Sequence, residues 1–466
     1  MSDFICSDFR EMVRKMNLLL RVEQNFDIVY RVVRVGNRQA CIYCVDGFVK
    51  DEVMNKIQDS LLSLGENTPE TAHELSKAAM PYVEVNLSDE KEKIITMILS
   101  GVLCLIVEGY KEAVLIDCRR YPARSVEEPQ KYKVLRGSRD GFVETLVSNA
   151  ALIRRRIRST MLSFEIYTVG DTSKTDVSIC YMNDRVDQKM LKDIRKRVEH
   201  IVVDALSMNQ ESLAECLYPG HWFNPFPKFK YSERPDATCA SLLEGHIVLL
   251  VDNSPAAMIV PTTIFDVMEE GDDYYFPPVT GTYLRFARTL LTLVSIFLTP
   301  LYLLFTQNPQ WIPEWLQFIN LKNEVYVPLI YQLLILEIAI DGLKLAAINT
   351  PSMLNTPLSL IAALIIGDFA TQSGWFNAEV MLYMAVVAIA NFTHESYELG
   401  YAIKFMRVIT LILVWFFSLY GFIAGVVLIV FCIVSNKTIT GTSYVAPLIP
   451  FNGKQLMRRL FRVKLK

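Results

Sequence analysis

Short apolar runs alternate with amphipathic helical segments from residue 1 to about residue 283. Such alternation is typical of α/β domains, because half-buried strands and surface helices repeat their apolar positions with different periods. The pattern occurs twice. We therefore predict two α/β subdomains, at residues 1–120 and 143–283, joined by a charged linker at 121–142 that contains two prolines.

The periodicity of the apolar residues also predicts the strands and helices of each subdomain. The first contains strands at 40–46, 102–107 and 111–117 and helices at 51–64 and 89–100. Asp89 stands where the second of these helices needs an N-cap. The second contains strands at 176–181, 245–252 and 256–260 and a helix with one charged face at 186–200.

Long apolar runs replace this pattern beyond residue 283. About 20 apolar residues, each adding 1.5 Å of helix, cross the ~30 Å hydrocarbon core of a bilayer. We therefore predict an α-helical polytopic transmembrane domain at 284–434, followed by a basic tail at 435–466. Its segments are 284–305, 325–348, 358–370, 380–392 and 408–434.

Two of these segments have unusual lengths. Segment 358–370 is too short to span without help, and we predict that it is re-entrant, a half-helix that ends at Gly367-Asp368 and is buried in protein. Segment 408–434 is long enough to tilt, or to break at Gly421 and Gly425.

Basic residues that flank the segments predict the orientation. Arg285 and Arg288 open the first span, and the tail after Pro450 carries six basic residues and no acid. Both termini are therefore expected in the cytoplasm. This requires an even number of crossings, so one of the five apolar segments must be re-entrant or a broken hairpin.

The composition narrows the functional classes. The chain has 466 residues, of which 52% are hydrophobic and 21% charged, and a formal net charge of −3. Nucleic acid is therefore not expected as a partner, because binding it requires a basic face. The nine cysteines have no framework spacing, so disulfides are not expected. Cys41 and Cys44 form a lone CxxC, which fits core packing better than metal or redox chemistry.

Catalytic motifs are missing from the sequence. No glycine-rich phosphate loop follows a predicted strand, no serine or cysteine stands in a nucleophile motif, and the five histidines are scattered. The sequence predicts neither an enzyme nor a cofactor or metal site.

Ionisable residues occur inside the predicted spans. Glu337, Asp341 and Lys344 share one helical face, at spacings of four and three residues. They could be a structural Asp341–Lys344 pair or a polar stripe that lines a pore. Asp368 is a further candidate pore or bundle residue, although it and Glu379 could instead be interfacial.

A second polar group precedes the last span. Tyr397, Glu398, Lys404 and Arg407 indicate a short amphipathic segment at the cytoplasmic surface that leads into segment 408–434.

The densest polar cluster of the soluble part lies at 127–158. Its composition indicates a glycine-bearing loop that leads into a basic helix, which is most often a solvated face, less often an interaction surface, and could bind an anion. A second polar block follows at 233–236. The residues of interest are Glu128, Pro129, Arg136, Gly137, Arg139, Gly141, Phe142, Glu144, Asn149, Arg154, Arg155, Arg156, Glu233, Arg234, Pro235 and Asp236.

These blocks resemble the GerA-type spore germination proteins, which comprise the A subunits of germinant receptors and their SpoVAF relatives. Ser138 departs from the proline that is common in receptor subunits. The likeness continues, in order, through 242–245, 273–275, 341–344, 367–368, 396–400 and 447–450. Of these, 341–344, 367–368 and 397–400 look more like the SpoVAF branch.

The resemblance implies a protein of the inner spore membrane, in contact with its lipid, that works in germination of the endospore. Family A subunits are thought to form oligomeric ion channels, so a homo-oligomer is expected, with a second membrane or lipoprotein germination subunit as a further partner. Our leading hypothesis is a SpoVAF-type ion channel or channel-like subunit that promotes ion release. The alternatives are the A subunit of a nutrient receptor complex and a non-conducting membrane scaffold.

Overall fold

The computed structural model describes residues 5, 8–65, 68–80, 84–121, 137–218, 223–321, 326–349 and 370–462. The chain forms two compact units, which we call the sheet unit and the helical unit. The sheet unit comprises Met1–Pro219 and Phe229–Pro261, and the helical unit comprises Gly220–Lys228 and Thr262–Lys466.

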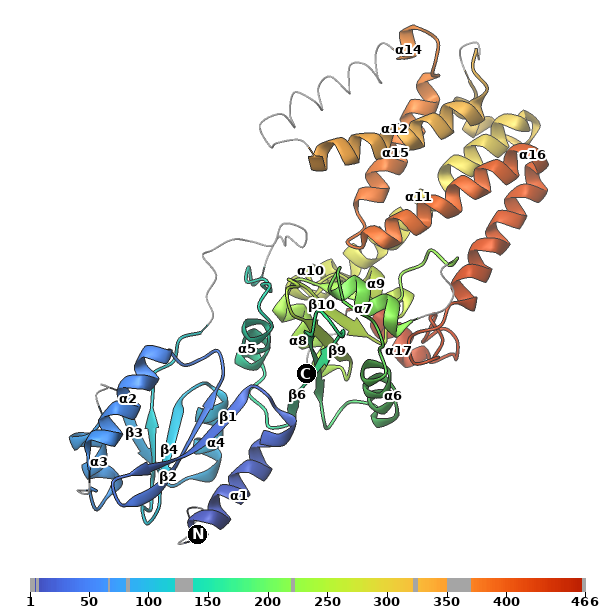
Figure 1. The fold of residues 1–466 in the computed structure, drawn as a ribbon. Helices are drawn as coiled ribbons and strands as arrows, with labels where there is room; N and C mark the ends of the chain where they lie inside the picture. The colour runs from blue at the N-terminus through green and yellow to red at the C-terminus, as the bar shows by residue number, and fades with distance from the viewer. Residues whose placement is uncertain are drawn as a thin grey trace. The chain divides into compact units, whose positions relative to one another are not determined.

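The sheet unit contains two five-stranded antiparallel sheets with the same topology, β1-β2-β4-β5-β3 and β6-β7-β9-β10-β8 (Figure 1). The strands are β1 Ile28–Val35, β2 Arg38–Val45, β3 Val85–Ser88, β4 Leu103–Val107, β5 Ala113–Ile116, β6 Leu162–Val169, β7 Thr175–Met182, β8 Lys230–Ser232, β9 Ile247–Val251 and β10 Ala257–Val260. The predicted α/β fold class is confirmed.

The helices of the sheet unit also repeat, because each half runs helix, two strands, two helices, strand, helix, two strands. The helices are α1 Phe9–Leu20, α2 Asp51–Ser63, α3 Ala72–Ala78, α4 Lys91–Leu99, α5 Leu146–Arg156, α6 Gln188–Glu199, α7 Gln210–Leu217 and α8 Pro235–Leu243, with a 3₁₀ turn at Val22–Gln24. The N-cap of α4 is Glu90, so the prediction of Asp89 was wrong by one residue.

A tight turn sets the register of the first hairpin. Val35 pairs with Arg38, so that only Gly36 and Asn37 connect β1 to β2. Gly36 has φ +61°, and a Cβ there would lie 1.9 Å from the Thr68 hydroxyl oxygen. Glycine is therefore required both by the turn and by the loop that packs on it.

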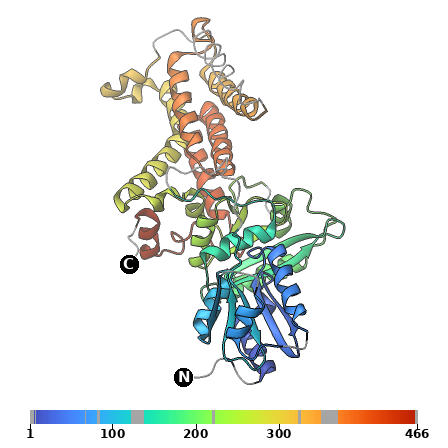
Figure 2. The ribbon, with the colours of Figure 1, turned by 90° about the vertical axis from the view of Figure 1, so that its left-hand side faces the viewer.

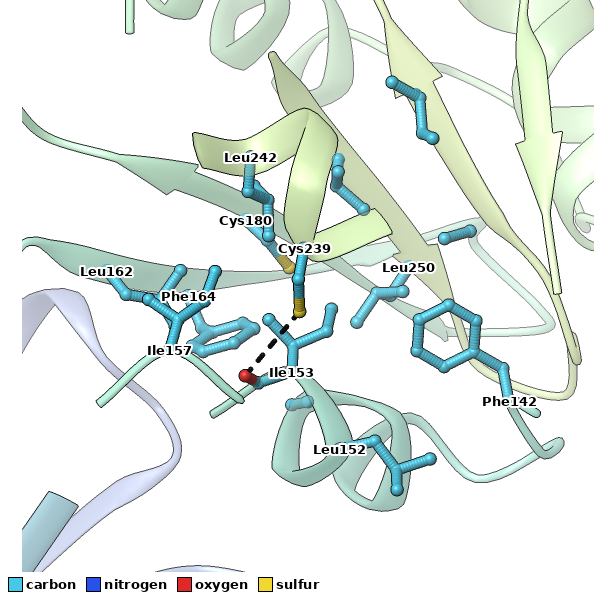
Figure 3. Packing of buried hydrophobic residues seen from close by; sticks show 14 of the residues in the cluster. Phe142, Leu152, Ile153, Ile157, Leu162, Phe164, Cys180, Cys239, Leu242 and Leu250 are labelled. Atoms are coloured by element: carbon cyan, nitrogen blue, oxygen red, sulfur yellow. Dashed lines mark hydrogen bonds between the residues drawn. The ribbon is translucent and has the colours of Figure 1, made fainter. Parts of the chain in front are cut away.

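The core of the second half lies between one face of its sheet and the helices α5 and α8. Phe142, Leu152 and Ile153 pack there against strand residues such as Leu250 (Figure 3). The Cys239 thiol lies 3.9 Å from the Ile153 carbonyl oxygen in this core.

Cys41 and Cys44 lie in β2 and are buried. Burial raises the pKa of each thiol to about 11. Because a thiol must ionise to act as a nucleophile or bind a metal, the environment of this CxxC fits packing.

A buried ion pair joins the two halves of the sheet unit. The Arg154 guanidinium, from α5, contacts both carboxylate oxygens of Asp27 at 2.7 and 3.0 Å, and both side chains are at most 1% exposed. Arg154 also donates to Asn25 and to the carbonyls of Ser159 and Leu162, so its fork is saturated.

In the described part of the helical unit, two short helices precede the longer ones. Its elements are α9 Ile264–Met268, α10 Asp272–Tyr275, α11 Pro278–Gln307, α12 Leu329–Asn349, α14 Ala370–Gln372, α15 Ala378–Phe392, α16 Tyr397–Ser435 and α17 Gly453–Leu460, with 3₁₀ turns at Pro309–Trp311 and Glu314–Ile319. Among the described residues, α11 and α16 are long and apolar enough to cross a membrane, by length and composition. Helix α12 has 21 residues but carries three charges. The predicted re-entrant segment 358–370 lies outside the described residues, apart from its last residue.

Helix α16 is a hairpin of two arms, and the break is not at the predicted glycines. The backbone leaves helical geometry at Ser418, with φ 50° and ψ −123°. Thr410 on one arm faces Gly425 on the other, where a Cβ would approach within 2.6 Å of the threonine side chain. Figures 1 and 2 show the two arms (orange-red and red). The glycines therefore permit close packing of the arms rather than the break itself.

We predict that Arg154→Met lowers the free energy of unfolding of the sheet unit by about 3–5 kcal/mol, because Asp27 would keep a buried charge without a partner. The measurement is urea unfolding of the full chain in detergent, in which protease cleavage within the sheet unit reports the fraction unfolded at each urea concentration. Glu11→Gln, which removes the exposed Glu11–Lys15 pair, is the control and should cost at most about 1 kcal/mol. Equal effects of the two substitutions would contradict this prediction.

Candidate functional site

One face of α11 is polar along its whole length. Its residues are Arg285, Arg288, Thr292, Ser295, Thr299, Tyr302 and Thr306, spaced alternately by three and four positions. All of them except Thr306 are buried in the helical unit. We call this face the polar seam. Polar side chains at membrane depth face the bundle interior because lipid solvates them poorly.

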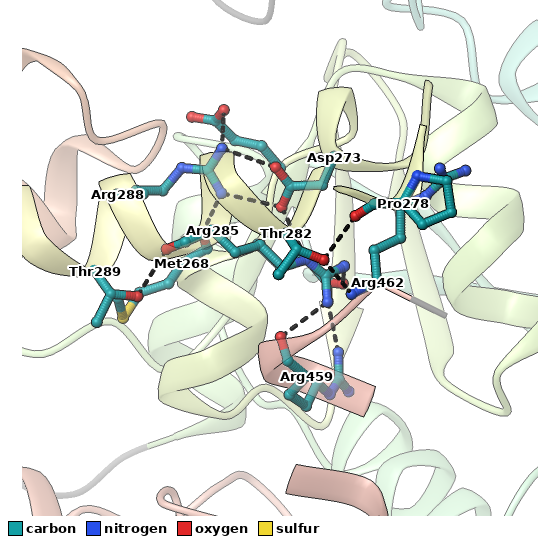
Figure 4. A network of polar contacts seen from close by, with 11 residues as sticks. Met268, Asp273, Pro278, Thr282, Arg285, Arg288, Thr289, Arg459 and Arg462 are labelled. Atoms are coloured by element: carbon teal, nitrogen blue, oxygen red, sulfur yellow. Dashed lines mark hydrogen bonds and ion pairs between the residues drawn. The ribbon is translucent and has the colours of Figure 1, made fainter. Parts of the chain in front are cut away.

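The seam begins at a group of ion pairs centred on Asp273, which is fully buried (Figure 4). Arg288 contacts both of its carboxylate oxygens at 3.1 Å, and Arg285 contacts one of them at 3.3 Å. Arg285 also pairs with Glu269 at 2.6 Å. The two arginines that were expected to set the orientation are therefore already neutralised within the protein.

The C-terminal tail is fixed to the same place. Arg459 of α17 pairs with Asp266 at 2.7 Å and with Glu269 at 2.6 Å. The Arg462 backbone N–H donates to the Thr282 hydroxyl at 3.2 Å (Figure 4). An adjacent cavity of about 140 Å³, lined by Phe265, Phe286 and neighbouring residues, is smaller than most ligand pockets.

A second ion pair crosses the middle of the bundle. The Glu337 carboxylate of α12 accepts two hydrogen bonds from Arg407 of α16, at 2.6 and 2.9 Å. Arg407 also donates to the hydroxyl and the carbonyl of Ser295 in the seam, at 3.0 and 2.7 Å. Glu337 and Arg407 are 3% and 2% exposed, so three helices meet at one buried, fully bonded charge pair.

The pairing of Asp341 differs from the structural pair that we considered. Asp341 forms its ion pair with Lys404, whose ammonium group also donates to the Glu337 carbonyl at 2.8 Å. Lys344 instead lies over the rings of Phe392 and Tyr401, at 4.6 and 5.6 Å from their centroids.

Lys404 and Arg407 were expected in an amphipathic segment at the membrane surface, and this was wrong. Both lie on the first arm of α16 and are at most 8% exposed. They bind acids of α12 that are 63 and 70 residues away along the chain.

The family model described as Bacillus/Clostridium GerA spore germination protein matches residues 16–466. The chain belongs to this GerA family.

Two relatives and one solved structure illustrate the likeness. Stage V sporulation protein AF of Bacillus subtilis is 36% identical over 94% of this chain and 89% of its own length. Spore germination protein KA of the same organism is 27% identical, over 95% and 82%. The crystal structure of the N-terminal domain of the A subunit of the Bacillus megaterium spore germinant receptor GerK3 is 26% identical, with a TM-score of 0.42 over 55% of this chain and 96% of that one.

In this GerA-family chain, the motif loop at 137–144 and the helix α5 are held by internal hydrogen bonds. The Asn149 side chain exchanges two hydrogen bonds with the Val143 backbone, at 2.8 and 2.5 Å. The Phe142 N–H donates to the Glu233 carbonyl at 2.8 Å, which joins the two predicted motif blocks.

Four of the motif's arginines have partners within the sheet unit. Arg156 pairs with Asp140 at 2.5 Å, Arg155 lies over the Tyr121 ring, and Arg234 pairs with Asp236 at 2.6 Å. With Arg154 bound to Asp27, these contacts favour a structural role for the motif over anion binding. The motif loop at 137–144 also holds Gly137, Arg139, Gly141 and Glu144, and α8 begins at Pro235. Outside the described residues lie Glu128, Pro129, Arg136 and Asp368.

Sequence reasoning missed the polar seam, although its signal was present. Seven polar residues recur at helical spacing along α11. The mean hydropathy of this segment, however, indicates only that it is apolar on average. Among the parts of the chain that the structure describes, no group of three His, Cys, Asp or Glu residues is placed to hold a metal.

We predict that Arg407→Gln lowers thermal stability by the equivalent of about 3–5 kcal/mol, because the buried Glu337 carboxylate would lose both hydrogen bonds from Arg407 and keep only the longer ion pair to Lys404, at 3.7 Å. The double substitution Arg407→Gln with Glu337→Gln should recover part of this loss. Thermal unfolding of the full chain in detergent is the measurement, with the exposed Arg14→Gln as control. A double variant that is less stable than Arg407→Gln alone would contradict the pairing.

Proposed function

We propose that this chain is an oligomeric ion channel, or a channel-like subunit, of the Stage V sporulation protein AF type, and that it promotes ion release during spore germination. The supporting observation is the charge cluster formed by Glu337, Asp341, Lys404 and Arg407 inside the membrane helices. Ionisable groups at that depth are costly, and they commonly mark an ion pathway. The proposed role is not enzymatic and requires no cofactor.

The cluster opens to one side, and this side supports an oligomer. The Asp341 side chain keeps 30% of its exposure although it is paired with Lys404. Around it, the second half of α12 has exposed residues on several sides, including Ile338, Leu345 and Ile348. Lipid would solvate Asp341 poorly, whereas water between neighbouring copies of the chain would solvate it well.

The hairpin in α16 supports a multi-pass protein with both termini in the cytoplasm. Its two arms, of about 20 residues each, are roughly 25–30 Å long and reverse direction at Ser418. A hairpin whose two arms both cross adds an even number of crossings. Our proposal places this protein in the inner spore membrane, in contact with its lipid and with a second germination subunit.

The alternative function is that of an A subunit in a nutrient receptor complex, and the identity with Spore germination protein KA favours it. The chromosomal neighbourhood discriminates between the two. Neighbouring genes for B and C receptor subunits would favour the receptor, and genes for dipicolinic acid transport would favour the Stage V sporulation protein AF type. A third hypothesis for the function is a non-conducting membrane scaffold.

We predict that Asp341→Asn changes ion flux through the protein, reconstituted in liposomes, by about tenfold, which corresponds to ~1.4 kcal/mol. Asp193→Asn, which removes a half-exposed acid of α6 paired with Arg197, is the matched control and should conduct normally. No flux from a correctly folded oligomer, alone or with partner subunits, would overturn the channel. Normal flux from Asp341→Asn would remove this carboxylate from the pathway.

A further inference from the structure

Glu379 is an acid of the bundle that forms no ion pair with the residues that the structure describes. It lies in the first turn of α15, and its Oε2 atom is buried. Within the described parts of the chain, this oxygen has no hydrogen-bond partner, and no ion pair to Glu379 is formed. This contrasts with Glu337, which is bound by Arg407.

Two tyrosines lie beside this carboxylate. Tyr383 is four residues after Glu379 on α15, so both side chains lie on the same helical face. The Tyr383 ring packs on the ring of Tyr302 in the seam, with the centroids 4.3 Å apart. Val380, the residue after Glu379, packs in the same apolar cluster as Tyr302 and Tyr383.

The seam itself provides the second, independent observation. Tyr302 is 2% exposed, and its hydroxyl has no hydrogen-bond partner among the described residues. Thr299, one turn earlier, is fully buried and its hydroxyl is likewise unpartnered in the described structure. Polar groups that only hold helices together are normally bonded. Among the described residues these hydroxyls therefore keep their hydrogen-bonding capacity for water or for a bound ion.

The charge of the group indicates what it binds. Glu379 is half-buried, but its Oε2 atom is shielded from water, and a proton or a cation stabilises a carboxylate oxygen in such a place. Oxygen atoms and two aromatic faces suit a cation. One carboxylate supplies a single negative charge, whereas Ca²⁺ and Mg²⁺ prefer sites with more carboxylates or bound phosphates.

We propose that Glu379, Tyr302 and Tyr383 form a binding site for a monovalent cation such as K⁺ or Na⁺. The site lies about 25 Å along α11 from the Asp273 cluster, because Tyr302 follows Arg285 by 17 residues. Its assignment as a station for the permeant ion rests on the proposed channel function, whereas the binding itself does not.

The test is thermal unfolding of the full chain in lipid nanodiscs, in KCl or NaCl and in N-methyl-D-glucamine chloride of equal ionic strength. The unfolding midpoint of the unsubstituted protein should rise by about 2–4 °C with K⁺ or Na⁺. Glu314→Gln, which removes an exposed acid of the loop after α11, should show the same rise. Glu379→Gln should show none.

A second variant protects the test against misfolding. Tyr302→Phe keeps the ring contact and removes the hydroxyl, so it should fold normally in N-methyl-D-glucamine chloride and show a smaller rise with K⁺. An equal rise in Glu379→Gln, no rise in the unsubstituted protein, or an infrared signature of a protonated Glu379 carboxyl would overturn the site. A rise in the unfolding midpoint without ion flux would support the cation site and overturn the channel. Ion flux without a rise in the midpoint would support the channel and overturn the site.

Discussion

The poor solvation of charge inside an apolar helix bundle is the constraint on which the helical unit depends. Glu337 and Arg407 are both buried, and a single geometry of α11, α12 and α16 satisfies them together with Ser295. Near the start of α11, the buried Asp273 likewise requires a positively charged partner, and Arg285 supplies one. The helices therefore pack where their charges can be paired, and apolar contacts fill the remaining surface.

This constraint explains why only part of the candidate site was predictable. Helical spacing placed Glu337 and Asp341 on one face of one span, and the structure brings both to the same cluster. Their partners Lys404 and Arg407 lie on another helix, and spacing along one sequence carries no information about such pairs. The break at Ser418 was also missed, because glycine is the usual signal for a bend and serine is not.

In the sheet unit, the predictable elements were the buried ones. β4 and β9 are continuous apolar runs buried along their whole length, and the sequence shows them clearly. The edge strand β1 was not predicted, because its residues are mostly exposed and arginines interrupt its apolar positions. The repeat was predicted from alternation alone, and the two identical sheet orders confirm it. Arg154 was singled out by its motif, but its partner Asp27 lies 127 residues away and was not.

The measurement that tests the account most directly is a structure of the protein in a lipid membrane, at a resolution that shows side chains. The central claim is that the open side of the charge cluster, at Asp341, faces a space shared by neighbouring copies. The account predicts a closed ring of subunits with Asp341 directed toward a water-filled axis. A monomer, or a ring in which Asp341 faces lipid, would contradict it.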